Sequence, residues 1–148
     1  MSEFKRILVP LDGSPLAEKA LPIAVTLAQK FVSTIILLRV LDVPTPSAPT
    51  SHLEITIDWV MEARKYALLE AERYLDARQG EIHEQGIRVR ALIRDTSPPE
   101  DILNVATAEE IDLIVLTSHG EGGLARWTFG SVADKVARHS ACPVLLVR

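Results

Sequence analysis

Four of the seven glycines in this chain lie in one short stretch, which ends in the dipeptide Gly130-Ser131. Glycine lets a backbone approach a ligand closely and adopt positive φ angles. An apolar stripe of helical spacing begins directly afterwards, so Gly130 and Ser131 are expected at a helix N-terminus, where free N–H groups and the helix dipole favour an anion. The stretch therefore predicts a phosphate-binding loop, with the Ser131 hydroxyl as a further donor. The alternative is a connecting loop whose glycines only turn the chain.

A carboxylate follows the first apolar run of the chain, in the segment Pro10-Leu11-Asp12-Gly13-Ser14. The Asp12 side chain would bond a ribose hydroxyl or help to hold Mg²⁺ on phosphate groups, because Mg²⁺ prefers oxygen ligands. The alternative is a structural role, since Asp-Gly is also a common turn sequence. The expected place of Asp12 at the carboxyl end of a strand favours the functional role.

The remaining candidates do not make up a catalytic set. His119 has no carboxylate partner that the sequence identifies, so packing or hydrogen bonding is favoured over general-base catalysis. The P-loop pattern is absent, and the G-x-G-x-x-A match at residues 120–125 lies in the last βα unit, whereas the dinucleotide fingerprint belongs in the first. Arg126 would reach phosphate oxygens or stay in solvent, and Cys142 is expected to be a small core residue. We therefore predict no catalytic residue and assign no metal ligand.

Four runs of the sequence are apolar almost throughout, which is typical of strands buried on both faces of a parallel sheet. These runs are residues 7–9, 35–38, 113–116 and 144–147. A fifth stretch, residues 88–93, alternates polar and apolar side chains in its first half. That pattern favours a strand near an edge of the sheet.

Helical patterns lie between these runs. A first helix is expected from Ser14, as its N-cap, to Phe31, with Pro22 two turns inside it and bending it. The second is expected over residues 58–85, after a long loop at residues 41–56. Two further helices begin with capping-box spacings, which pair a serine with an acidic residue three positions later: Ser97 with Glu100, and Ser131 with Asp134.

Strands that alternate with helices predict an α/β fold. We expect an open, doubly wound, Rossmann-like sheet of five parallel strands with helices on both faces, forming a single domain over residues 1–148. Such sheets bind ligands outside the carboxyl ends of their strands, near the point where the strand order reverses. The Asp12 segment and the glycine-rich stretch are therefore expected at the same edge.

The composition narrows the function classes. The chain has 148 residues, a formal net charge of −4 and no clustered basic face, which argues against a nucleic-acid binder. Cys142 is the single cysteine, so no internal disulfide is expected. No apolar run approaches the roughly 18 residues of a membrane span, and the first residues lack a signal-peptide layout. We expect a soluble, cytoplasmic protein with no membrane partner.

These segments resemble one family. The segment Pro10-Leu11-Asp12-Gly13-Ser14 after a first strand looks like the opening of universal stress proteins. The sequence Thr117-Ser118-His119-Gly120, followed by nine residues and Gly130-Ser131, is similar to that family's nucleotide motif, G-x-x-G, nine residues, G-[S/T]. Residues 131–147 also resemble the family's ending, so the resemblance covers essentially the whole chain. It implies the strand order 3-2-1-4-5 and a homodimer, paired through the edge strand Pro143 to Val147.

The resemblance also implies binding of ATP, or of AMP or ADP, and we expect Mg²⁺ to accompany the phosphates. By position, one group would line the adenosine and a second the ribose and phosphates, while a third would hold the phosphate tail. The adenosine group is Pro10, Leu11 and Asp12, with the backbone of Val40 against the adenine. The ribose and phosphate group is Leu116, Thr117 and Gly120. The group at the phosphate tail is Gly130, Ser131 and Val132.

Two positions depart from the family pattern. Thr117 stands where the motif has its first glycine, and a β-branched residue would be costly there if the position needs positive φ or close backbone approach. If the position needs only a small residue at a strand end, Thr117 is harmless and could donate a hydrogen bond. Thr96-Ser97 stands where many relatives carry glycine. The later glycine spacing is intact, so we favour an ATP-binding regulator of the stress response with at most slow hydrolysis. The alternative is a dimeric interaction module of the same family that binds no nucleotide.

Overall fold

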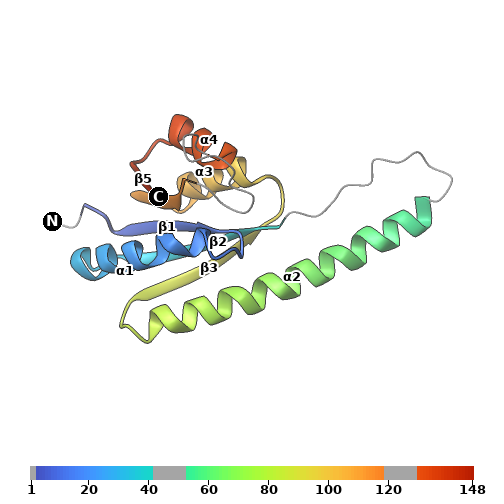
Figure 1. Cartoon of the computed structure of the whole chain (residues 1–148), viewed down its shortest axis with the longest axis horizontal. Coiled ribbons are helices and arrows are strands. Elements are labelled where there is room, and N and C mark those ends of the chain that lie inside the picture. The colour runs from blue at the N-terminus through green and yellow to red at the C-terminus, as the bar shows by residue number, and fades with distance from the viewer. Residues whose placement is uncertain (1–2, 42–52, 119–129) are drawn as a thin grey trace.

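The computed structural model describes residues 3–41, 53–118 and 130–148. One parallel sheet lies between two layers of helices, with α1 and α2 on one face and α3 and α4 on the other (Figure 1). The strands are β1 (Arg6–Leu11), β2 (Thr34–Val40), β3 (Arg88–Arg94), β4 (Leu113–Thr117) and β5 (Val144–Val147). The helices are the 3₁₀ helix η1 (Ala17–Lys19), α1 (Ala20–Phe31), α2 (Leu53–His83), α3 (Pro98–Ala108) and α4 (Ser131–His139).

The strand order is β3-β2-β1-β4-β5, and every neighbouring pair runs parallel. This confirms the predicted α/β fold, the order 3-2-1-4-5 and the edge position of the 88–93 stretch. The residues of β3 are all exposed or half-buried because only one of its faces is well covered, whereas the first four residues of β4 are all buried.

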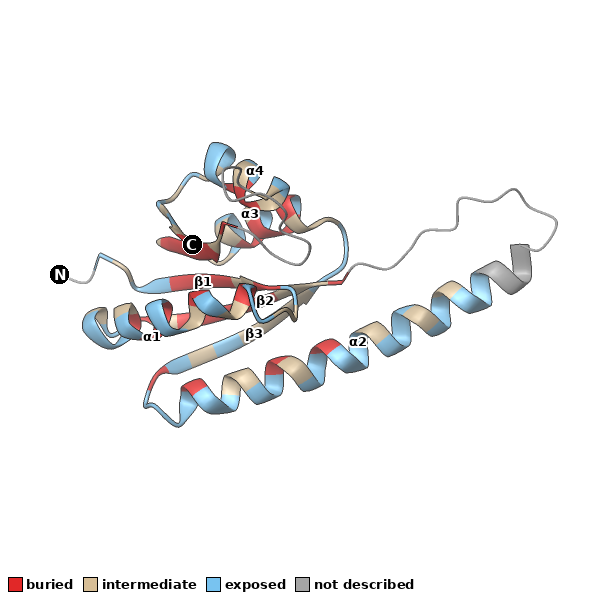
Figure 2. Ribbon diagram, in the orientation of Figure 1, coloured by how far each residue is buried: buried red, intermediate tan, exposed pale blue. Residues whose placement is uncertain are grey.

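Side chains of successive strand residues point to opposite faces, which divides the core in two. Ile7, Val9 and Leu11 of β1 join α1 and α2 in one cluster, whereas Leu8 joins α3 and α4 in the other. β2 and β4 alternate in the same way, and the buried positions lie along the sheet in Figure 2. We call these clusters the α1–α2 core and the α3–α4 core.

The predicted starts and caps of the helices need correction at four places. α1 begins only at Ala20, after η1, so Pro22 lies in its first turn, where the missing N–H has no partner in the helix; the predicted position two turns inside was wrong. Ser97 makes no side-chain cap. Instead, the Asp101 carboxylate accepts from the backbone N–H groups of Thr96 (2.8 Å) and Ser97 (3.1 Å).

The fourth helix corrects the second capping box. Gly130, not Ser131, is the N-cap of α4, and the described residues give this helix no side-chain cap. The Asp134 carboxylate instead pairs with Arg138 one turn later, at 2.9 Å. Ser131 is thus the first residue of the helix.

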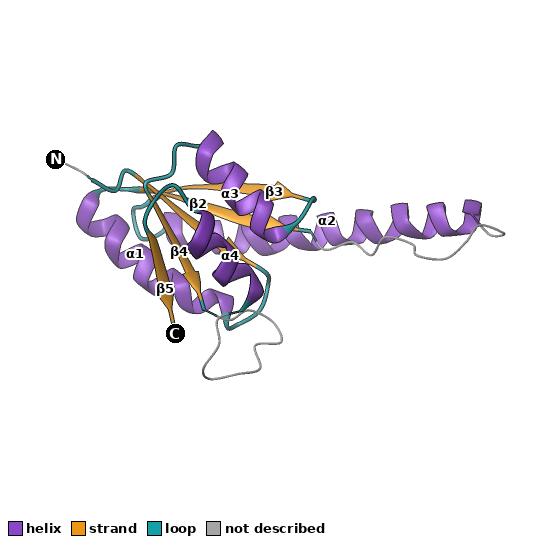
Figure 3. Ribbon diagram, turned by 90° about the horizontal axis from the view of Figure 1, so that it is seen from above, coloured by secondary structure: helices purple, strands orange, loops and turns teal. Residues whose placement is uncertain are grey.

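The second helix is longer than predicted, because α2 begins at Leu53 rather than at residue 58. Its N-terminal half extends past the sheet in both views (Figures 1 and 3). Several large apolar side chains are exposed along it: Ile57, Trp59, Met61, Tyr66, Leu68 and Leu69. Within the described residues, no helix is long and apolar enough to cross a membrane.

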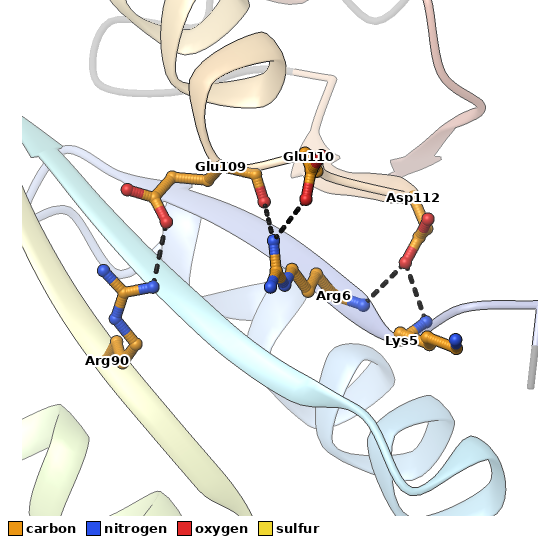
Figure 4. A network of polar contacts seen from close by, with 6 residues as sticks. All are labelled: Lys5, Arg6, Arg90, Glu109, Glu110 and Asp112. Carbon is orange, nitrogen blue, oxygen red and sulfur yellow. Dashed lines mark hydrogen bonds and ion pairs between the residues drawn. The ribbon is translucent and has the colours of Figure 1, made fainter.

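A polar network holds the amino edge of the sheet (Figure 4). The Asp112 carboxylate accepts from the backbone N–H groups of Lys5 (2.8 Å) and Arg6 (2.9 Å), at the start of β1. The Arg6 guanidinium donates to the Glu109 carbonyl at 2.7 Å and pairs with Glu110 at 3.2 Å. These contacts join β1 to the turn before β4, at the end of the sheet opposite the predicted site.

Candidate functional site

The two central strands part before their carboxyl ends. β1 pairs with β4 only at Ile7 and Leu8, whereas its pairing with β2 continues to Leu11. Between β1 and β4 the strand order also reverses direction, because β2 and β3 lie on one side of β1 and β4 and β5 on the other. The structure therefore has its switch point here, which is where open α/β sheets bind ligands.

Pro10 accounts for the early end of this ladder. The Lys5 carbonyl accepts from Thr34 at the start of β2, and the Arg6 carbonyl accepts from Asp112 next to β4. Backbone groups of successive strand residues point to opposite sides, so the even-numbered residues of β1 face β4. Pro10 has no N–H to donate on that side. A proline near the end of a central strand was the sequence signal for this opening.

The N-terminus of α4 is tied to the end of β4. The Gly130 N–H donates to the Ser118 carbonyl at 2.7 Å, and the Ser118 N–H donates to the Val147 carbonyl at 2.9 Å. Ser118 is buried, whereas Ser131 is exposed. The first N–H groups of an α-helix have no acceptor inside the helix, so α4 presents donors beside the switch point.

Asp12 forms the turn after β1. Its Oδ1 accepts from the Ser14 backbone N–H at 2.9 Å and from the Ser14 hydroxyl at 2.5 Å. The Ser14 hydroxyl in turn accepts from the Ala17 N–H at 3.2 Å, at the start of η1. Asp12 therefore forms the Asx turn that was the alternative to a functional role, and it remains exposed at the carboxyl end of β1.

The other predicted residues divide between the two cores. Val40 and Val132 are half-buried against the α3–α4 core, to which Leu116 belongs. Leu11 belongs to the α1–α2 core, on the other side of the sheet. Val40, Leu116 and Val132 thus line the face on which α4 begins. Gly120, His119 and Arg126 lie outside the described residues.

The backbone conformation at Thr117 does not require the glycine of the family motif. It is the last residue of β4 and pairs with Val147 of β5. Among the described non-glycine residues, positive φ occurs at Val32 and Glu110, so Thr117 keeps an ordinary strand conformation. The β-branched side chain therefore adds no backbone strain there.

The described residues hold no group of three or more His, Cys, Asp or Glu side chains that would bind a metal ion. The chemistry that the described part of this edge offers is recognition: apolar side chains from β2, β4 and α4, one carboxylate, and the N–H groups of a helix.

Sequence reasoning missed Arg39, which lies behind the Asp12 turn. Gly13 has a φ of +86°, and a Cβ at this position would lie 2.9 Å from Nη1 of Arg39. The guanidinium pairs with Glu70 of α2 at 2.8 Å. Residues 13, 39 and 70 share no local spacing, so no sequence pattern would have grouped them.

Tyr74 of α2 lies between two cations. The guanidinium carbons of Arg39 and Arg78 are 5.2 and 5.6 Å from its ring centre, and Arg78 also pairs with Glu18 of η1 at 2.5 Å. In the part of the chain that the structure describes, the buried Tyr74 hydroxyl has no hydrogen-bond partner. Burial, with a smaller contribution from Glu18, raises the pKa of Tyr74 from 10.0 to about 12.

This raised pKa predicts a loss of stability in alkali. The folded state favours the neutral phenol, so the contribution of Tyr74 is complete below pH 10 and is lost as the pH rises towards 12. In denaturant titrations, the free energy of unfolding should fall less steeply between pH 10 and 12 in Tyr74→Phe than in the wild type. Tyr66→Phe, at an exposed tyrosine of the same helix, is the control. Equal slopes in all three proteins would contradict the prediction.

The comparisons with known proteins agree on one family. The model of the universal stress protein family matches residues 3–148. The chain belongs to the universal stress protein family. Universal stress protein YxiE of Bacillus subtilis is 33% identical over 147 residues, which cover 98% of this chain and 99% of the relative.

Solved structures of universal stress proteins share this fold. Universal stress protein UspA from Lactobacillus plantarum superposes with a TM-score of 0.84 at 28% identity, over 98% of each chain. A universal stress protein family member from Arabidopsis thaliana, solved with AMP bound, has a TM-score of 0.61 at 17% identity. The match covers 97% of this universal stress protein and 90% of the plant chain, and at that identity it shows the fold alone.

Proposed function

We propose that this universal stress protein binds an adenine nucleotide, ATP or its relatives AMP and ADP, at the carboxyl edge of the sheet. The observation that carries the proposal is the early end of the β1–β4 ladder next to the N-terminus of α4. The parted strands leave backbone groups and apolar side chains for a base and ribose, and the helix N-terminus suits the phosphates.

Each side of the nucleotide has a candidate partner. Val40 at the end of β2 offers its backbone to the adenine, and Asp12 offers a carboxylate to a ribose hydroxyl or to Mg²⁺ carried on the phosphates. The N–H groups of α4 would bind the phosphate oxygens. The full set is the one that the family motif implies: Pro10, Leu11, Asp12, Val40, Leu116, Thr117, Gly120, Gly130, Ser131 and Val132.

The biochemical role that fits is a nucleotide-dependent regulator in the stress response, acting as one domain over residues 1–148 in the cytoplasm. A protein of the same fold holds AMP, which makes adenine nucleotides the first ligands to test. Hydrolysis would be slow, because phosphoryl transfer needs a positioned base or an equivalent group and we assign none to this chain. The second candidate is an interaction module that binds no nucleotide.

The test is thermal unfolding of nucleotide-free protein with ATP and Mg²⁺ titrated in, and with AMP and GTP for comparison. A ligand at 100 times its Kd stabilises the fold by about 2.7 kcal/mol. For a chain of this size, that is a rise in Tm of roughly 5–10 °C. We expect a saturable rise with ATP and AMP and a smaller one with GTP.

Gly130→Leu separates binding from folding. Gly130 has φ −60° and ψ 155°, a conformation that any residue adopts, so leucine should fold there but block the phosphate end. Ala137→Leu, which adds the same side chain at an exposed position of the same helix, is the control. Gly130→Leu should lose the ATP-dependent rise, and Ala137→Leu should keep it. A wild type that shows no rise up to millimolar ATP would overturn the proposal and favour the interaction module.

We also propose that the protein pairs as a homodimer through β5. β5 is an edge strand, and its Leu145 side chain is exposed. Pairing with a second copy would satisfy the open backbone groups of this edge and bury Leu145. Sedimentation at micromolar concentration should show a dimer, and a monomer there would contradict this pairing.

A further inference from the structure

The turn that carries Asp12 is held from two sides. Inside the turn, the Asp12 carboxylate accepts from Ser14, as described above. Outside it, the guanidinium of Arg39 lies against Gly13. A Cβ added at Gly13 would lie within 3.1 Å of three Arg39 atoms, Nη1, Cζ and Nη2. The turn is therefore packed directly against a cation that comes from the neighbouring strand.

Arg39 is itself fixed by α2. Its Nη2 donates to Oε2 of Glu70 at 2.8 Å, and its Nη1 donates to Oε1 at 3.4 Å. Its Cζ lies 5.2 Å from the ring centre of Tyr74, and only 14% of its side chain is exposed. A two-point contact with a carboxylate and an aromatic ring beside it leave a guanidinium little freedom.

Arg39 also adjoins the other end of the proposed site. It precedes Val40, and the two side chains point to opposite faces of β2. Arg39 thus lies on the α2 side of the sheet, whereas Val40 packs against the α3–α4 core. One residue therefore connects α2 both to the Asp12 turn and to the end of β2.

We propose that Arg39 is a positioning residue for nucleotide binding: clamped by Glu70 and Tyr74, it holds the Asp12–Ser14 turn so that the Asp12 carboxylate faces the ligand. The inference rests on the proposed function, because it assigns Asp12 to the nucleotide. It adds a residue that does not touch the nucleotide and that acts through Asp12.

The test measures the Kd for ATP in Arg39→Met, which keeps a linear side chain but removes the charge and the donors. We expect the Kd to rise about tenfold. Arg88→Met is the matched control, since Arg88 lies on β3 at the amino edge of the sheet and donates to the Val32 carbonyl at 3.3 Å. It should leave the Kd unchanged. Arg39→Lys should restore part of the affinity, because a cation returns to the same place.

Coupling to Asp12 separates positioning from a general loss of structure. If Arg39 acts through Asp12, then Asp12→Asn combined with Arg39→Met should bind ATP no more weakly than Asp12→Asn alone. Effects on the Kd that multiply in the double variant would overturn the proposal. So would an Arg39→Met protein whose Kd stays within about twofold of the wild type.

A second readout does not depend on nucleotide. The Ser14 backbone N–H is protected by Asp12, so in the unliganded protein its hydrogen exchange should be about tenfold faster in Arg39→Met than in Arg88→Met. Should the wild type bind no nucleotide, the proposed function fails, while this measurement still decides whether Arg39 holds the turn. Equal exchange in the two variants would overturn the positioning role.

Discussion

Gly13→Ala is expected to lower the free energy of unfolding by about 1–3 kcal/mol, because a non-glycine residue is strained at a φ of +86°. The new Cβ would also stand 2.9 Å from Nη1 of Arg39. A guanidinium at the end of a flexible side chain would normally move aside at little cost. Here its contacts with Glu70 and Tyr74 resist that movement, so the loss should exceed the backbone strain alone.

Gly80→Ala supplies the matched control with the opposite sign. Gly80 lies inside α2, and nothing lies within 4 Å of an added Cβ. Alanine there should raise the free energy of unfolding by about 0.5–1 kcal/mol, because glycine in a helix loses more conformational entropy on folding. Urea titrations of the two variants and the wild type give the comparison. If Gly13→Ala left the midpoint unchanged or raised it, as Gly80→Ala should, the strain assigned to Gly13 would be wrong.

Ile36→Ala should have the largest effect on stability. Ile36 is fully buried in the middle of β2 and belongs to the α3–α4 core. Removing this side chain should cost about 2–5 kcal/mol, because the surrounding strands cannot close the cavity completely. For a chain of this size, the loss corresponds to a fall in Tm of roughly 4–20 °C.

Calorimetry would check this prediction against Leu145→Ala, on the edge strand. Leu145 is 38% exposed in the single chain, so in a monomer alanine there should lower the Tm much less than Ile36→Ala. If Leu145→Ala proved as costly as Ile36→Ala, the side chain would be buried in solution, which is the result expected of a dimer through β5. An Ile36→Ala protein within about 1 kcal/mol of the wild type would contradict the placement of Ile36 in the core.

The sheet was predictable because its signal is local and repeated. Runs such as residues 35–38 and 113–116 are too apolar for a half-exposed strand, and the alternation at residues 88–93 marks an edge. The helix starts were harder to predict from the sequence. Near Ser97, two acidic residues compete for the Ser97 backbone N–H, and the carboxylate of Asp101 rather than that of Glu100 accepts from it. Sequence spacing alone does not rank such competitors.

Those residues of the candidate site that lie at strand ends or beside glycines could be predicted from the sequence. Asp12, Gly130 and Ser131 could be selected because each lies where an apolar run ends or an apolar helix begins. Arg39 could not, because its importance comes from contacts with Gly13 and Glu70 that exist only after β1, β2 and α2 have packed together.

The division of the core into two clusters has a consequence for evolution. The sheet separates the side chains of the α1–α2 core from those of the α3–α4 core, and the residues facing the proposed ligand belong mainly to the second. Substitutions that do not touch one another contribute almost independently to stability. A lineage could therefore change the surface of α1 and α2 while the proposed ligand site on the opposite layer stays as it is. Arg39 of β2, which contacts both α2 and the Asp12 turn, is the residue through which such a change would reach the proposed nucleotide site.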